Sequence, residues 1–171
     1  MRKLIIYSKY DSYFDRIANL VEDYDDKVCY VTLNKTYEFL VSRFNDMGVG
    51  ADNFYFVDAI TGMLDRIEDT EDCDYVSSPA RLDEISDAIK KGLKKDCKLV
   101  ILDSLSNFFD YYPEEGPEKN VLVEFLKSFA EDVEDLDVVF VVKREDEENF
   151  ILQKALSFFD SFEGDFVPLG I

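Results

Sequence analysis

The chain contains no histidine and no tryptophan, and it has only seven glycines, four prolines and three cysteines in 171 residues. Without histidine, neither a Ser-His nor a Cys-His catalytic pair can form, and metal sites with imidazole ligands are excluded. The cysteines are Cys29, Cys73 and Cys97. An odd number with no close pair argues against a disulfide framework and against a zinc site. We therefore expect no metal and no cofactor.

Long apolar runs and excess positive charge are also missing. No apolar run approaches the roughly 20 residues of a membrane span, and no secretory leader is visible, so we expect a cytoplasmic protein. The chain has 38 acidic and 19 basic side chains, which gives a net charge of −19. Such a surface repels phosphate backbones and anionic lipids, so we expect neither nucleic acid nor membrane as a partner. The acidity either serves solubility or forms a docking face.

The sequence does contain enough apolar material for a substantial core. Hydrophobic residues make up 47% of the chain and aromatic residues 15%. A chain of this length folds as one domain and buries roughly 70% of the surface of its unfolded form. We therefore expect a single domain over residues 1–171 with a core rich in Phe and Tyr.

Short β-branched runs alternate with segments of helical periodicity. This alternation is typical of βαβ units, in which helices cover a parallel sheet. The main strands are expected at Leu4–Tyr7, Val28–Leu33, Phe54–Val57, Lys98–Leu102 and Val138–Val142. A short strand is expected near Tyr75 and an edge strand over Phe166–Ile171. The sequence predicts an α/β fold with three layers, α/β/α, around a mostly parallel sheet.

Helix signals lie between these runs. Ser12 and Thr36 precede helical patterns and are candidate N-caps, and Gly48 stands where a helix C-terminal glycine belongs. Three further helices are expected over Leu82–Leu93, Glu118–Glu131 and Glu145–Phe159. In the second of these, Val121 is expected to face inward with the other apolar residues.

The order and spacing of several segments resemble the RecA-like domains of KaiC-type ATPases. One segment, similar to their second strand, helix and third strand, reads KVCYVTLNKTYEFLVSRFNDMGVGADNFYFVDAIT. Another, KLVILDSLSNFF, resembles their Walker B strand, with Asp103 at its end and Ser104 after it. The likeness covers the chain from Lys3 to about Phe166 and implies a RecA-like order, which we take to set the first and fourth strands side by side. A flavodoxin-like order is the alternative.

The likeness fails where a nucleotide triphosphate would bind. A P-loop requires the motif Gly-x-x-x-x-Gly-Lys-Ser/Thr between the first strand and the first helix, because glycine lets backbone amides turn toward the phosphates. The junction here reads Ser8, Lys9, Tyr10, Asp11, Ser12, without a glycine. We interpret the chain as a degenerate family member without a Walker A motif.

The candidate site residues lie where strands end. In the family, Asp103 would bind magnesium, and Asp58 ends the third strand. Each is more simply a structural aspartate that caps a helix or loop, although together they could share an ion if their strands end side by side. A ligand-binding edge could also include Ser8, Lys9, Lys143 and Arg144. Open α/β sheets bind ligands at this edge.

Four aromatic residues follow Asp103, namely Phe108, Phe109, Tyr111 and Tyr112. Core packing is their default role, but four aromatics beside Pro113 also suggest that part of the group forms an exposed interaction surface. We therefore predict a non-catalytic KaiC/RecA-like domain that binds a protein partner or another copy of itself. The alternative is a sensor that binds a small ligand or nucleotide at the carboxyl edge of the sheet. A weak nucleotide-dependent enzyme is a third and less favoured interpretation.

Overall fold

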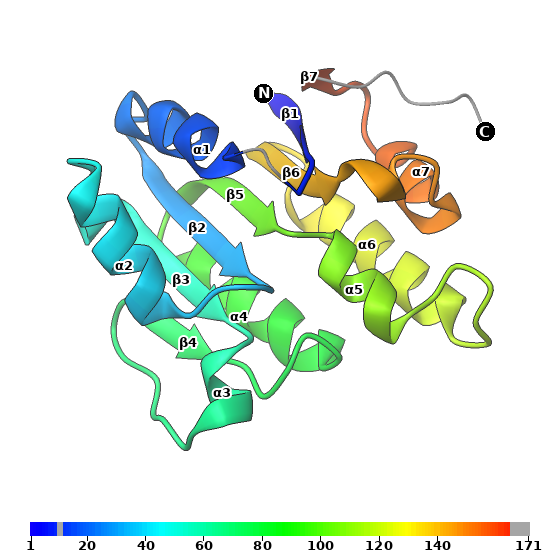
Figure 1. Ribbon diagram of the computed structural model, residues 1–171, viewed down its shortest axis with the longest axis horizontal. Coiled ribbons are helices and arrows are strands. Elements are labelled where there is room, and N and C mark those ends of the chain that lie inside the picture. The colour runs from blue at the N-terminus through cyan, green and yellow to red at the C-terminus, as the bar shows by residue number, and fades with distance from the viewer. Residues whose placement is uncertain (10–11, 165–171) are drawn as a thin grey trace.

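The computed structural model describes residues 1–9 and 12–164. Within these residues, seven strands form one sheet in the order β4-β3-β2-β5-β6-β1-β7, and every pair of neighbours is parallel (Figure 1). The strands are β1 Arg2–Tyr7, β2 Lys27–Thr32, β3 Phe54–Asp58, β4 Cys73–Tyr75, β5 Cys97–Asp103, β6 Asp137–Lys143 and β7 Glu163–Gly164. All five main strands were predicted from apolar runs, whereas the edge strand expected over Phe166–Ile171 lies outside the described residues.

The helices are α1 Tyr13–Glu22, α2 Tyr37–Asp46, α3 Thr61–Leu64, α4 Leu82–Lys94, α5 Ser106–Tyr111, α6 Lys119–Asp132 and α7 Phe150–Leu156. Single 3-10 turns span Ala51–Asn53 and Arg144–Asp146. None of the described helices has the length and apolarity to cross a membrane. The predicted last helix over Glu145–Phe159 is thus too long, because a 3-10 turn precedes it and Asn149 caps α7 through the amides of Ile151 and Leu152.

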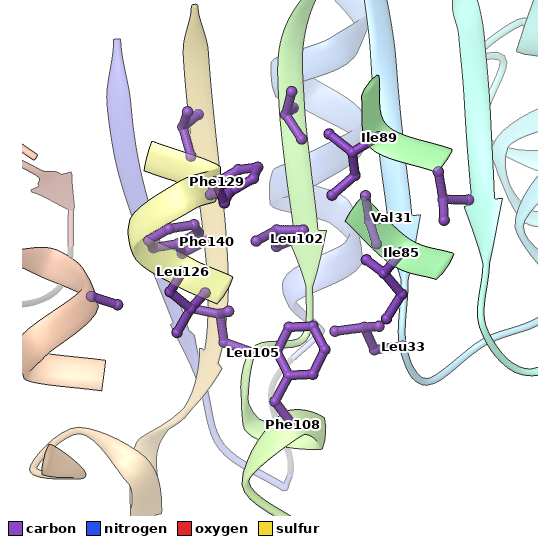
Figure 2. Packing of buried hydrophobic residues seen from close by; sticks show 14 of the residues in the cluster. Val31, Leu33, Ile85, Ile89, Leu102, Leu105, Phe108, Leu126, Phe129 and Phe140 are labelled. Carbon is purple, nitrogen blue, oxygen red and sulfur yellow. The ribbon is translucent and has the colours of Figure 1, made fainter. Parts of the chain in front are cut away.

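Two hydrophobic clusters, one on each face of the sheet, account for the three layers. Side chains of α1 and α2 pack with Val28 and Tyr30 of β2, while those of α4, α6 and α7 pack with Cys29 and Val31. Successive residues of one strand therefore enter opposite cores, which is why the central strands read as unbroken apolar runs. In Figure 2, Leu102 and Phe140 of the sheet lie against Ile89 of α4 and Phe129 of α6.

The expected adjacency of the first and fourth strands is wrong. β6 lies between β1 and β5, with Leu4 opposite Phe140 on one side and Leu102 opposite Phe140 on the other. The connection through α6 returns the chain directly beside β5 as β6, and β1 pairs with the other side of β6. A second expectation is also wrong, because Val121 of α6 is 52% exposed rather than buried. Its position on α6 turns it away from the sheet, while Leu122 is fully buried.

The two predicted N-caps differ in what they do. The Thr36 hydroxyl accepts a hydrogen bond from the amide of Phe39, whereas Ser12 makes no side-chain cap to α1. We expect Thr36→Ala to lower the free energy of unfolding by about 1 kcal/mol, since one amide of α2 loses its acceptor. Ser12→Ala is the matched control and is expected to change it by less than about 0.5 kcal/mol. Urea denaturation measures both, and equal losses would contradict the assignment.

Candidate functional site

Because the strands are parallel, their carboxyl ends meet along one edge of the sheet. Asp103 of β5 lies opposite Thr32 of β2, Asp58 of β3 lies opposite Thr32 on its other side, and Tyr7 of β1 lies opposite Lys143 of β6. This edge therefore collects almost all of the residues that the sequence marked as candidates.

Asp103 is completely buried, and both of its carboxylate oxygens are engaged. Oδ1 accepts hydrogen bonds from the Tyr13 hydroxyl at 2.7 Å and from Nδ2 of Asn34 at 3.2 Å. Oδ2 accepts from the Tyr30 hydroxyl at 2.5 Å and from Nζ of Lys35 at 3.3 Å. Four side chains from α1, β2 and the loop after β2 thus surround one carboxylate.

Lys35 supplies the positive charge of this cluster. Its ammonium group forms the ion pair with Asp103, donates a hydrogen bond to the Tyr13 hydroxyl and another to Oδ1 of Asn34 at 3.1 Å, and lies 4.6 Å from the centre of the Tyr13 ring. A buried carboxylate is tolerated only when it is paired and hydrogen-bonded. Lys35 therefore serves as a built-in counter-ion for Asp103.

The two tyrosines are held as hydrogen-bond donors. Burial raises the pKa of Tyr13, and the negative charge of Asp103 raises it further. The same causes, in the same order, raise the pKa of Tyr30 well above its ordinary value. Both hydroxyls consequently stay protonated throughout the neutral pH range, and the hydrogen bonds to Asp103 persist there.

Ser104 also has an internal role. Its buried hydroxyl donates to the carbonyl oxygen of Val141 at 3.0 Å and accepts from the amide of Ser106 at 3.3 Å. The Ser106 hydroxyl in turn accepts from the amide of Lys143 at 2.8 Å. These contacts fasten the end of β5 to the end of β6.

Asp58 is separate from Asp103. β2 lies between their strands, so the two strands do not end side by side, and the condition for one magnesium ion shared by both aspartates is not met. Buried Asp58 accepts hydrogen bonds from the amides of Tyr37, Ile60 and Thr61 and from the Thr61 hydroxyl. It therefore fixes the loops that begin α2 and α3. Among residues 1–9 and 12–164, no three Cys, Asp or Glu side chains are grouped to hold a metal ion.

The remaining predicted edge residues do come together. A cavity of about 460 Å³ at the ends of β1 and β6 is lined by Tyr7, Ser8, Lys9, Lys143, Arg144 and Glu145. Arg144 also pairs with Glu147 at 2.9 Å. Three basic side chains thus surround one cavity in a strongly acidic protein, while Asp58 is not part of its lining.

The aromatic group after Asp103 is mainly core. Phe108, Phe109 and Tyr112 are buried, with Phe108 packed edge-on against Phe125, and only Tyr111 is exposed. The expectation of an exposed surface is therefore wrong for three of the four residues. The reason is that α5 packs its apolar face into the hydrophobic cluster that α4 and α6 form with the sheet; Figure 2 shows Phe108 pointing toward Leu33.

Sequence reasoning did not identify the partners of Asp103. Tyr30 reads as part of an apolar strand, Tyr13 as a helix residue on a buried face, and Asn34 and Lys35 as a polar turn. The available signal was that Asn34 and Lys35 directly follow a strand of a parallel sheet, at the edge where Asp103 also ends.

Comparison with known proteins supports the fold. No family model matches the sequence, and no curated protein matches it either. Among solved structures, 76 chains are similar. One is a KaiC-like protein from the hyperthermophilic archaeon Pyrococcus horikoshii OT3, with a TM-score of 0.51 and 14% sequence identity over 83% of this chain. The match covers 60% of that protein's length. The chain has a KaiC/RecA-like α/β fold.

Proposed function

We propose that this chain is a RecA-like domain that does not hydrolyse nucleotides and that acts in the cytoplasm by binding another protein or a second copy of itself. Its acidic surface makes nucleic acid and anionic membranes unfavourable partners. The proposal rests on Asp103, the residue that the Walker B resemblance would assign to magnesium. Both of its carboxylate oxygens already accept hydrogen bonds from side chains of the same protein.

A catalytic magnesium site keeps carboxylate oxygens available for the ion and its phosphate-bound partners. Here Lys35, Tyr13, Tyr30 and Asn34 already use both oxygens of Asp103. A magnesium ion would have to displace the ammonium group of Lys35 and the hydroxyls of Tyr13 and Tyr30. The raised pKa values of both tyrosines keep these hydroxyls protonated as hydrogen-bond donors. Asp103 therefore acts as a structural anchor, which means that it holds the side chains of its four partners in place instead of binding magnesium.

The connection after β1 supports the same proposal. β1 ends at Tyr7 and α1 begins at Tyr13, which leaves residues 8–12 between them. The eight-residue P-loop motif places two glycines in this position. The five residues here contain no glycine, so they lack both the length and the backbone freedom that a phosphate cradle requires.

Calorimetric titration and thermal denaturation with ATP and magnesium test this proposal. Ligand at 100 times its dissociation constant would add about 2.7 kcal/mol to stability. We expect no heat of binding, no thermal shift and no phosphate release. Binding of ATP that requires magnesium and is lost in Asp103→Asn would refute the non-catalytic assignment.

The cavity at β1 and β6 supports a second candidate function, a sensor of a small anionic metabolite. Lys9, Lys143 and Arg144 provide the positive charge, and Ser8 provides a hydroxyl. The same titration covers this candidate when inorganic phosphate and citrate are included as probes. A thermal shift with either anion, reduced in Lys143→Gln and unaffected by magnesium, would favour the sensor over the interaction module.

A further inference from the structure

Four large apolar side chains lie exposed around α3. Leu64 is 74% exposed, Met63 47%, Ile67 45% and Tyr111 of α5 42%. The Tyr111 hydroxyl donates to the Met63 sulfur at 3.9 Å, which joins α5 to the segment around α3. We call Met63, Leu64, Ile67 and Tyr111 the α3 patch. The remaining large apolar residues exposed within the described chain, apart from Met1 at the N-terminus, are single positions on α2, α6 and α7.

The backbone at the start of α3, which carries Met63 and Leu64, is held in place. Asp58 accepts hydrogen bonds from the amides of Ile60 and Thr61 and from the Thr61 hydroxyl, so α3 is fixed to the end of β3. Gly62 approaches the segment after β4 so closely that a Cβ atom there would lie 2.8 Å from the carbonyl oxygen of Val76. Side chains displayed on a fixed turn lose little backbone freedom when they bind.

A hollow borders the α3 patch. It has a volume of about 470 Å³, and its lining includes Ile67, Tyr75 and Val76 together with the charged side chains of Asp65, Arg66 and Glu68. Exposed Leu64 and Ile67 beside a hollow with a charged rim resemble the usual arrangement of a protein interface, in which an apolar centre is surrounded by polar residues.

The charge around the α3 patch selects the partner. The exposed segment 62–72 carries five carboxylates, at Asp65, Glu68, Asp69, Glu71 and Asp72, against the single guanidinium of Arg66. Asp110 is exposed next to Tyr111, and we call these six carboxylates the acidic rim of the α3 patch. A second copy would bring the same acidic rim, and another net charge of −19, against this one. Like charges placed together at an interface are strongly unfavourable, so the rim favours a basic partner.

We propose that the α3 patch docks a basic amphipathic segment of another protein, with apolar side chains of that segment on Leu64 and Ile67 and its Lys and Arg side chains on the acidic rim. This inference rests on the proposed function as a protein-binding module and names the surface and the chemistry of the partner. Apolar contacts at the centre hold the segment, and the charges of the rim orient it and exclude a second copy.

The test uses three synthetic fluorescent peptides and the full chain. The first is an amphipathic helical peptide of Leu and Lys, the second has the same composition in an order without an apolar face, and the third has Glu in place of Lys. Fluorescence anisotropy measures the dissociation constants. We expect the first peptide to bind best and the Glu peptide not to bind. Leu64→Ser combined with Ile67→Ser is expected to weaken the first peptide about tenfold or more, because two central apolar contacts are lost.

Phe39→Ser is the matched control, since Phe39 is 51% exposed on α2 and belongs to no part of the α3 patch. None of these substitutions changes the net charge, so a nonspecific attraction to the acidic surface stays constant. Circular dichroism verifies that each variant folds. Equal binding of the two Lys peptides, absence of binding, or equal effects of the Phe39 and Leu64/Ile67 variants would overturn the proposal.

Self-association is tested on the same samples. If light scattering shows that the wild-type chain forms dimers and that Leu64→Ser with Ile67→Ser makes it monomeric, the occupant is a second copy and the proposed basic partner is wrong. The ATP titration reports on Asp103 and on the residues between β1 and α1, none of which belongs to the α3 patch. Failure of the non-catalytic assignment is thus distinguishable from failure of this inference.

Discussion

Replacing Asp103 by alanine is expected to lower the free energy of unfolding by about 3–5 kcal/mol, the range measured when one partner of a buried charge pair is removed. The hydroxyls of Tyr13 and Tyr30 would lose a buried acceptor, and each unsatisfied polar group costs about 1–3 kcal/mol. Lys35 adds less, because its side chain is 21% exposed and can reach water. Thermal denaturation is expected to show a fall in Tm of roughly 10 °C.

Two comparisons make this result interpretable. Asp87 is exposed on α4, and Asp87→Ala is expected to change stability by less than about 0.5 kcal/mol. If Asp103 were instead reserved for a metal ion, its removal would relieve unpaired negative charge in the metal-free protein. Unchanged or increased stability of Asp103→Ala would therefore contradict the anchor role, and with it the main support for a non-catalytic domain.

Replacing Phe140 by alanine is expected to cost about 3–5 kcal/mol, the usual loss for a large aromatic residue removed from a packed core. Phe140 is fully buried on β6, between Leu4 and Leu102 on the neighbouring strands. Its ring stacks on Phe162 at 5.1 Å between centroids and meets Phe159 edge-on at 5.5 Å. The substitution leaves a cavity that the surrounding sheet cannot close, because strand positions are fixed by the ladders on both sides.

The same substitution at an exposed site provides the control. Phe39→Ala on α2 removes a ring that is 51% exposed, and alanine favours a helix more than phenylalanine does. We expect a change within about 0.5 kcal/mol. Guanidinium denaturation of both variants measures the difference. A loss at Phe140 no larger than that at Phe39 would show that the described packing of β6 is incorrect.

Unbroken apolar runs made most of the strands predictable, whereas the connections between the strands were less predictable. Val28 to Val31 alternate between two cores, and only a parallel sheet covered on both faces tolerates such a run. The strand order could not be predicted from the sequence, because β5 and β6 are equally apolar and either of them could have paired with β1. The burial of Phe108 was likewise not predictable, since it depends on how α5 packs against α6 and the sheet.

The candidate site divides in a similar way. Strand ends marked Asp58, Asp103 and Lys143 as edge residues, because parallel strands point their carboxyl ends the same way. Which of them meet was decided by pairing: Lys143 joins Ser8 and Lys9 through the contact of β1 with β6, while β2 separates Asp58 from Asp103.

The sequence alone determined the fold class, the excess of negative charge and the absence of glycine from residues 8–12, since the alternation of apolar runs with helical segments, the net charge and the glycine positions are properties of the chain itself. Only the tertiary structure decided that the negative charge of Asp103 is neutralised by Lys35 of the same protein. Its partners Tyr13, Tyr30, Asn34 and Lys35 lie 68 to 90 residues away in the chain. A short-range ion pair forms only when folding brings its charges within a few ångströms, and no local pattern records that distance.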